Sequence, residues 1–314
     1  MTTAPSDEQD AKYRASNAVL LVAFNRPERL NALIEHIRRV APPTVYVVVD
    51  GPRHADEVPA VEATRAAVTA IDWTTDVHTR FRPQNVGCRE SVIDAVSWFL
   101  HEQQQGIVLE EDVAPTTSFF RFCDEMLDQY AHESSAQAVC GVNLVPPSFV
   151  PDNSDYRLSI MGPSAAWATW NDRWQDFCTN RFDRSPLATF RKMLHNPHGG
   201  VLSAAHWSAL MVANRTKAMD SWAYPFMLFG MDRQRYSITP NRNLIEHQGI
   251  GEEATHMQEE SILAQPAYEL EFPLRAPPFL VLDPRAEKWS LDHEINATGS
   301  SLAGNARKLL QRLI

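Results

Sequence analysis

Short apolar runs separated by polar segments recur through the first 145 residues of the chain. Runs that are apolar throughout and rich in β-formers are typical of strands buried in a parallel sheet. Four runs fit this description, at 18–24, 44–49, 106–109 and 137–142. A fifth run at 76–81, DVHTRF, is more polar and is also predicted to be a strand.

Between these runs, apolar residues recur at helical spacing. A first helix is predicted after the segment Asn25-Arg26-Pro27, because Asn caps helices and Pro fits a first turn. Its apolar positions are Leu30, Leu33, Ile34 and Ile37. Further helices are predicted over 57–70, over about 89–104 and from Thr116 or Thr117 onward. Strands that alternate with helices predict an α/β fold, with a Rossmann-like, mostly parallel sheet and helices on both faces.

The pattern loosens after residue 145, and the second half of the chain is predicted to be irregular. Aromatic residues gather there in AAWATWNDRW (165–174), AHW (205–207) and DSWAYPF (220–226). Aromatic rings bind the CH faces of sugars, but they also fill ordinary cores, and the core is the favoured interpretation for most of these tryptophans.

The same pattern divides the chain. Residues 1–16 are polar and predicted to be disordered, 17–145 and 146–265 are two halves of one domain, and 266–314 is an extension. The extension holds an extended, proline-bounded segment and a basic amphipathic helix at 305–314. That helix is expected to dock on the body or pair with a second copy in a homodimer, and lipid contact would be peripheral only.

A formal net charge of −10 argues against broad nucleic-acid binding, which needs clustered Lys and Arg. The four cysteines, Cys88, Cys123, Cys140 and Cys178, form no CxxC pair and are predicted to be buried rather than paired. The start of the chain is polar and acidic, and no run approaches the roughly 20 apolar residues that span a bilayer. A cytoplasmic location is therefore expected.

Three consecutive acids, Glu110, Glu111 and Asp112, follow the apolar strand at 106–109 directly. Adjacent carboxylates repel each other, and a divalent cation would relieve that repulsion. Hard oxygen ligands suit Mg²⁺ or Mn²⁺, which bridge to substrate phosphates. The alternative is an exposed acidic turn before a helix, stabilised by the helix dipole.

Other polar loops follow the remaining predicted strands. They hold Asn25-Arg26, Asp50 and Asn85 to Gly87. The carboxyl ends of parallel strands meet at one edge of the sheet, where such folds bind ligands. Each of these loops taken alone is better explained by the preference of Asn, Asp and Gly for turns.

Several blocks in order resemble a family. IVLEEDVAPTTSFFRFCDEML (107–127) is similar to the acidic motif and following helix of bacterial family-2-like glycosyltransferases of the GT-A fold. A related motif occurs in the N-acetylglucosaminyltransferases of N-glycan synthesis. AFNRPERL, VDGPR, QNVGCRESV, AAWATWNDRW and ITPNRNLIEHQGIGEEATH resemble further blocks of the group, so the resemblance covers about 18–258. The middle acid is Glu111 where the family usually has Asp.

The resemblance implies a donor site for a nucleoside diphosphate sugar, with a UDP sugar as the favoured donor. Residues 17–145 would be the donor half and 146–265 the acceptor half. Asn25, Arg26 and Asp50 would contact the nucleoside. The base, ribose or phosphates would be lined by Asn85, Gly87 and Arg89, and Glu110 and Glu111 would hold the ribose or order water on the metal.

The resemblance also implies a metal site and a catalytic base. Asp112 would bind Mn²⁺ or Mg²⁺, and His256 would be a further ligand, although a lone His is more often structural. A carboxylate must take the proton of the acceptor hydroxyl. Asp220 is the first candidate and Asp172 the second, and either residue could instead be a helix cap or first-turn acid.

The sequence thus predicts a metal-dependent, inverting transferase that moves a sugar to an acceptor hydroxyl. One alternative is a nucleotidyltransferase that makes a nucleotide sugar, although AFNRPERL lacks the glycine-rich basic loop such enzymes carry. Another is a non-catalytic module that binds a nucleotide or a sugar.

Overall fold

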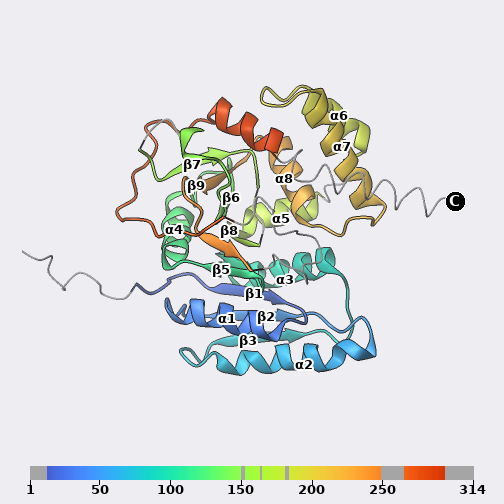
Figure 1. Cartoon of the computed structure of the whole chain (residues 1–314), viewed down its shortest axis with the longest axis vertical. Coiled ribbons are helices and arrows are strands. Elements are labelled where there is room, and N and C mark those ends of the chain that lie inside the picture. The colour runs from blue at the N-terminus through green and yellow to red at the C-terminus, as the bar shows by residue number, and fades with distance from the viewer. Residues whose placement is uncertain (1–12, 150–152, 163–164, 181–183, 249–264, 294–314) are drawn as a thin grey trace, which may run out of the picture.

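The computed structural model of the chain describes residues 13–149, 153–162, 165–180, 184–248 and 265–293 (Figure 1). An eight-stranded sheet runs through it in the order β3-β2-β1-β4-β8-β6-β9-β7. The strands are β1 (Val19–Ala23), β2 (Val45–Val49), β3 (Val77–Phe81), β4 (Gln105–Glu110), β6 (Ala136–Cys140), β7 (Tyr156–Ser159), β8 (Ala166–Trp170) and β9 (Tyr236–Pro240). A second, two-stranded sheet pairs β5 (Val113–Pro115) with β10 (Ile245–His247).

Two strands of the large sheet, β8 and the edge strand β7, run against the direction of the others. β1, β2, β3 and β4 are parallel to one another, so their carboxyl ends share one edge. β8 runs antiparallel to β4 and β6, while β6 and β9 are parallel and β7 is antiparallel to β9. The predicted α/β fold with a mostly parallel sheet is confirmed in this mixed form.

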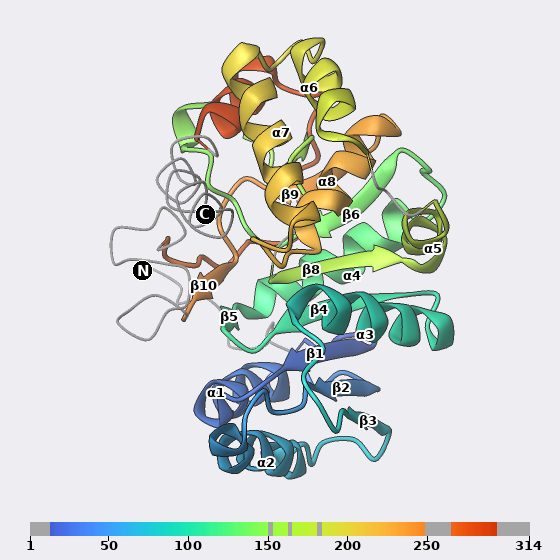
Figure 2. The same ribbon diagram turned by 90° about the vertical axis from the view of Figure 1, so that its right-hand side faces the viewer.

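Helices cover both faces of the sheet, as predicted (Figures 1 and 2). One face packs against α1 (Pro27–Arg38), α2 (Val58–Ala67) and α4 (Thr117–Gln129). The other face packs against α3 (Cys88–Glu102), α5 (Asn171–Thr179) and α8 (Ala223–Asp232). The remaining helices, α6 (Pro186–Leu194) and α7 (Val201–Arg215), form a hairpin beside α8.

The first half of the chain folds as its pattern predicts. All five residues of β1 and of β2 are buried, because both faces of these strands are covered. The predicted apolar positions of α1 are all fully buried. Thr116 caps α4, and its hydroxyl accepts a hydrogen bond from the Phe119 amide at 3.2 Å.

The prediction of an irregular second half was wrong, since regular elements fill much of it. α8 shows why the sequence pattern failed: seven consecutive residues, Pro225 to Met231, are buried, so it has no polar face to mark a helical period. The core interpretation of the tryptophans holds for Trp167, Trp174 and Trp207, which are fully buried.

Both ends of the chain bear on the predictions. Residues 13–16 are ordered, contrary to expectation: Ser16 N donates to Asp124 Oδ2 at 2.6 Å and Ala15 N to Val40 O at 2.8 Å.

In the extension, Leu282 forms a β-bridge with Leu158 of β7, and a helical stretch at 284–293 follows. The predicted terminal helix at 305–314 lies outside the described residues. Within the described parts, no helix has the length and apolarity needed to cross a membrane.

Candidate functional site

The register of the parallel strands brings four polar loops to one edge of the sheet. Ala23 of β1 is level with Val49 of β2, which is level with Phe81 of β3, and Val22 of β1 is level with Glu110 of β4. The residues that follow these strands therefore emerge side by side. They are Asn25 and Arg26, Asp50, Asn85 to Gly87, and Glu110 to Asp112.

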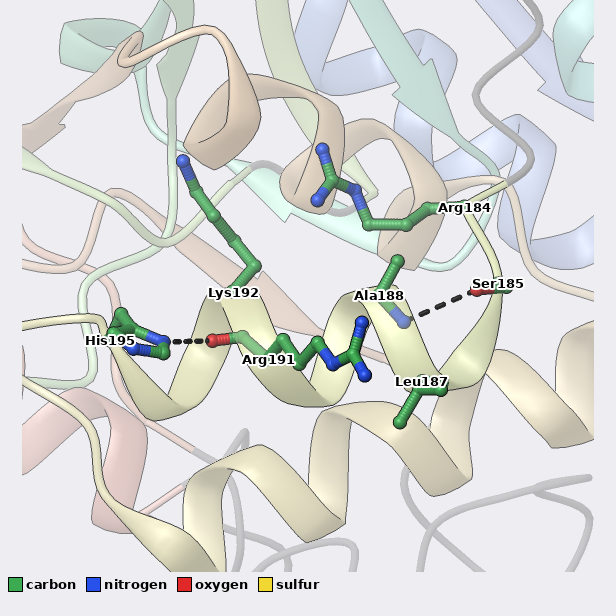
Figure 3. A pocket seen from close by; sticks show the side chains of 7 residues that line it. All are labelled: Arg184, Ser185, Leu187, Ala188, Arg191, Lys192 and His195. Atoms are coloured by element: carbon green, nitrogen blue, oxygen red, sulfur yellow. Dashed lines mark hydrogen bonds between the residues drawn. The ribbon is translucent and has the colours of Figure 1, made fainter.

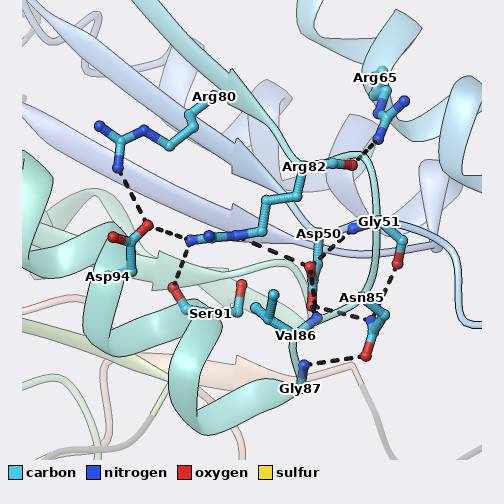
Figure 4. Close-up of polar contacts among 10 residues, drawn as sticks. All are labelled: Asp50, Gly51, Arg65, Arg80, Arg82, Asn85, Val86, Gly87, Ser91 and Asp94. Carbon is cyan, nitrogen blue, oxygen red and sulfur yellow. Dashed lines mark hydrogen bonds and ion pairs between the residues drawn. The ribbon is translucent and has the colours of Figure 1, made fainter.

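Asp50 is the centre of a closed hydrogen-bond network, here termed the Asp50 corner (Figure 4). Its side chain is buried, with 4% of the residue exposed. Oδ2 accepts from Asn85 Nδ2 at 3.0 Å, Oδ1 accepts from Gly51 N at 2.9 Å, and Val86 N lies 3.3 Å from both oxygens. Burial raises the pKa of Asp50, and these hydrogen bonds together with Arg82 oppose the shift.

A pocket of about 580 Å³ adjoins the Asp50 corner. It has a mixed lining of four apolar and four polar residues: Pro52, Ala55, Val58 and Pro83, and Arg53, His54, Gln84 and Asn85. Asn25 lies nearby but points to Glu57, since its Nδ2 is 3.4 Å from Glu57 Oε1. The guanidinium of Arg53 lies over the Phe24 ring, 5.1 Å from its centroid.

The acidic cluster, Glu110, Glu111 and Asp112, lies at the end of β4 and is half-buried. Burial, followed by the charges of Asp112 and Glu111, raises the pKa of Glu110 to about 8. Burial and Asp112 raise the pKa of Glu111 to about 7, against the opposing effect of Arg26 and Arg29. These shifts mark a site with more negative charge than its surroundings compensate.

Only one of the two carboxylate oxygens of Asp112 has a partner in the described parts of the protein. Oδ2 lies 3.7 Å from Arg26 Nη1, whereas Oδ1 is buried and has no hydrogen-bond partner among the described residues. The pairing of β10 with β5 places His247 opposite Val113, next to Asp112, and Gln248 N donates to the Asp112 carbonyl at 2.7 Å. Nε2 of His247 is likewise buried without a partner in the described parts.

Burial lowers the pKa of His247, and Asp112 opposes that shift. A neutral imidazole with a free buried nitrogen is the form that binds metal ions. Reasoning from sequence missed His247 and chose His256, which lies outside the described residues. The only signal for His247 was its place in the block ITPNRNLIEHQGIGEEATH, because its partner strand β5 is only three residues long.

No group of three or more His, Cys, Asp or Glu side chains in the described residues is arranged to hold a metal ion. Mg²⁺ and Mn²⁺ are often bound through one or two protein ligands, with waters and substrate phosphates completing the shell. The orphaned Oδ1 of Asp112 is the oxygen donor that both ions prefer. The free Nε2 of His247 is a nitrogen donor, so the pair fits Mn²⁺ better than Mg²⁺.

Asp220 reaches this edge from far along the chain. Gly87, at the start of α3, has φ of +87°, and a Cβ built on it would lie 2.6 Å from Asp220 Oδ2. The side chain of Asp220 is exposed, and with the three acids of the cluster it adds to the effect of burial in raising the pKa of Cys88. The structure thus brings Asp220 beside the acidic cluster.

Arg89 is linked through Asn214 to the loop that carries Asp220. Its Nη1 donates to Oδ1 of the buried Asn214 at 2.9 Å, and Asn214 Nδ2 donates to Ser221 O at 2.7 Å. The next residue, Trp222, is stacked on Trp167 at 4.8 Å, and its Nε1 lies 3.4 Å from Glu110 Oε1. These contacts fix the loop against α3 and against the acidic cluster.

The structure does not bring Asp172 to the site. β8 is antiparallel to β4, so its last residue, Trp170, lies opposite Gln105 at the start of β4. Asp172 follows in the first turn of α5 at the other edge of the sheet, exposed and 2.7 Å from Arg173 Nη1. It is therefore a first-turn acid and is excluded as the base.

Cys88 corrects the prediction that the cysteines are buried. The residue as a whole is exposed, although neighbouring atoms shield its thiol enough to raise the pKa.

In chemical terms, one edge of the sheet combines a rigid polar corner, an uncompensated acidic cluster and an exposed carboxylate. The chain matches no known protein-family model, and it matches no curated protein. Its function is therefore inferred from the geometry of this edge.

Proposed function

We propose that this protein is a metal-dependent glycosyltransferase of the GT-A type. It would transfer a sugar from a nucleoside diphosphate sugar, with a UDP sugar favoured, to an acceptor hydroxyl with inversion. The observation that carries the proposal is the juxtaposition of the acidic cluster with Asp220, because these groups come from segments about a hundred residues apart and share one sheet edge.

The donor nucleoside would bind beside the Asp50 corner. The adjoining pocket of about 580 Å³ lies within the range of small-molecule sites. Pro52 and Pro83 offer apolar surface to a base, while His54, Gln84 and Asn85 offer polar groups. The network around Asp50 would hold these walls in place before the donor arrives, which lowers the entropic cost of binding.

Asp112 and His247 would hold the divalent cation. When bound, Mn²⁺ or Mg²⁺ offsets the negative charge of a diphosphate leaving group. Arg26, 3.7 Å from Asp112, carries a positive charge at the same place and would exchange part of its contact with Asp112 for a phosphate oxygen. Glu110 and Glu111 would complete the negative field that attracts the cation.

Asp220 would act as the general base. Its exposed carboxylate would take the proton of the acceptor hydroxyl while that oxygen bonds to the anomeric carbon. The bond from the anomeric carbon to the diphosphate oxygen breaks in the same step, and its electron pair leaves with the nucleoside diphosphate. A single displacement of this kind inverts the anomeric centre.

The deciding experiment is thermal unfolding with UDP, GDP and dTDP sugars, each with Mn²⁺ or with EDTA. A ligand at 100 times its dissociation constant adds about 2.7 kcal/mol to the free energy of unfolding. We expect stabilisation by one nucleotide only, and only with Mn²⁺. His247→Ala should weaken the effect of Mn²⁺. The absence of stabilisation by any nucleotide would overturn the proposal, and stabilisation without transfer to any acceptor would indicate a binding module.

A further inference from the structure

The hairpin of α6 and α7 has a charge opposite to that of the whole protein. The formal net charge of the chain is −10, yet the 36 residues from Arg184 to Met219 contain five Lys or Arg and no Asp or Glu. The basic residues are Arg184, Arg191, Lys192, Arg215 and Lys217. A stretch of this kind attracts anions even when the molecule as a whole repels them.

Apolar side chains are exposed on the same hairpin. On α6, Leu187 is 59% exposed and Leu194 is 41% exposed. Leu187 and Leu194 lie seven residues apart, which is about two helical turns, so they share one face of α6. Arg191 lies between them on that face, and His195 follows Leu194 there. The opposite face of α6 holds Thr189 and Met193, which are buried.

α7 continues the exposed apolar surface. Val201 is 65% exposed, Leu202 is 76% exposed and Val212 is 38% exposed. Five of the large exposed apolar side chains of the described residues therefore lie on two adjacent helices, mixed with basic residues. Exposed apolar side chains beside basic ones are a feature that this hairpin shares with helices that lie in the interface of a bilayer.

A basic pocket of about 440 Å³ opens beside α6 (Figure 3). It is lined by Arg184, Ser185, Leu187, Ala188, Arg191, Lys192 and His195. Arg184 and Lys192 contact Asp232 of α8, whereas no salt-bridge partner of Arg191 is found among the described residues. Arg191 thus offers an uncommitted guanidinium next to exposed Leu187, which suits a phosphate group with an acyl chain beside it.

We propose that the α6–α7 hairpin docks this protein on the surface of an anionic phospholipid bilayer. Leu187, Leu194, Val201 and Leu202 would enter the headgroup region. Arg191 would contact lipid phosphates, and the other basic residues of the hairpin would add to the positive potential. Each Lys or Arg near an anionic membrane strengthens partitioning about fivefold at moderate salt. The exposed apolar side chains are few and lie beside basic and small residues, so they fit between fluid lipids.

The test is flotation of the full chain with vesicles of phosphatidylcholine alone or with 30% phosphatidylglycerol. We expect binding to the anionic vesicles only, weakened as NaCl rises. R191E/K192E should reduce partitioning at least about tenfold. L187S/L194S should also reduce it. The matched control is R14E/R39E, which makes the same charge change at two exposed arginines near the end of α1, far from α6.

Retention of fold is checked for each variant by its thermal unfolding curve. Three results would overturn the proposal: no binding of the unaltered chain to anionic vesicles, an equal loss in R14E/R39E, or retained binding in a folded L187S/L194S together with a folded R191E/K192E. Competition by millimolar inorganic phosphate that abolishes vesicle binding would also overturn it, because the hairpin would then be a site for a free anion. None of these readouts depends on glycosyl transfer.

Discussion

Two groups of carboxylates at the same sheet edge differ in how their charges are compensated. Both oxygens of Asp50 accept hydrogen bonds from neighbouring amide groups. In the acidic cluster, Asp112 Oδ1 is buried without a partner, and the pKa values of Glu110 and Glu111 rise to about 8 and about 7 through burial and mutual repulsion. The first group has all its hydrogen bonds within the protein, whereas the second has too little positive charge nearby, from Arg26 and Arg29, to offset its three carboxylates.

This difference suggests separate tasks for the two groups. A carboxylate whose hydrogen bonds are all satisfied by the chain rigidifies its surroundings. A cluster whose charges are left uncompensated costs stability and is retained where a cation or substrate supplies the missing charge. Substitutions should therefore affect stability at Asp50 and activity at Asp112.

The largest effect is expected for Asp112→Asn. We expect sugar transfer with Mn²⁺ to fall about 1000-fold, equivalent to about 4 kcal/mol in activation free energy, because a charged ligand is lost. The free energy of unfolding should stay the same or rise, since the change relieves repulsion. Transfer kinetics and urea unfolding measure both quantities. Asp172→Asn, at the opposite edge, is the control and should retain full activity.

A third buried carboxylate extends the comparison beyond the site. Glu287 is 0% exposed, and its Oε2 accepts from Ile160 N at 2.8 Å and from Ser159 Oγ at 3.2 Å. Its Oε1 has no partner among the described residues. Burial raises the pKa of Glu287 to about 7, against hydrogen bonds and Arg157. Glu287 thus has one carboxylate oxygen that accepts hydrogen bonds and one that has no partner in the described parts of the chain.

Because the folded-state pKa of Glu287 exceeds the unfolded value, protonation favours the folded state. The resulting stability is fully present below pH 4.5 and is lost as pH rises through about 7. Glu287→Gln removes this titration, so the variant should gain up to about 3 kcal/mol relative to the unaltered chain between pH 4.5 and 8. Urea unfolding of both proteins at pH 4.5 and at pH 8 measures this gain in the free energy of unfolding. Parallel pH profiles would contradict the prediction, and exposed Glu102→Gln is the control.

Asp50→Asn should lower the free energy of unfolding by about 2 kcal/mol, because an amide NH₂ would face donors that now reach a carboxylate oxygen. Three N–H donors now reach this carboxylate, and some of them would lose their acceptor or face the new amide NH₂. They are Asn85 Nδ2, Gly51 N and Val86 N. Chemical denaturation of this variant beside Asp112→Asn tests the comparison directly. If both variants lose the same stability, the two groups of carboxylates do not differ in the way inferred.

The first half of the fold could be predicted because most of its strands, β3 excepted, are buried on both faces. Short apolar runs bounded by polar segments, such as β1 and β2, indicate such strands, and parallel pairing then brings the polar loops that follow them to one edge. The presence of Asp50, Asn85 and the acidic cluster at one edge follows from that topology alone. The distances among them do not.

The second half could not be predicted because it depends on contacts between distant segments. The pairing of β5 with β10 joins Val113 to His247, and two strands of three residues carry little sequence signal. The antiparallel direction of β8 moves Asp172 to the far edge, and a strand's direction leaves no mark in its own residues. α8 is too deeply buried to show a helical period.

The smallest effect is expected at Gly87, where the Asp50 corner meets the loop of Asp220. Gly87 adopts φ of +87°, which side chains disfavour, and an added Cβ would lie 2.6 Å from Asp220 Oδ2. Gly87→Ala should lower the free energy of unfolding by about 1 kcal/mol and displace Asp220. A base displaced by a fraction of an ångström should reduce kcat about tenfold while KM for the donor is unchanged. Gly200→Ala is the matched control, because a Cβ there meets nothing within 4 Å. If kcat is unchanged in a folded Gly87→Ala, Asp220 is not the base, and the acidic cluster would have to act without it.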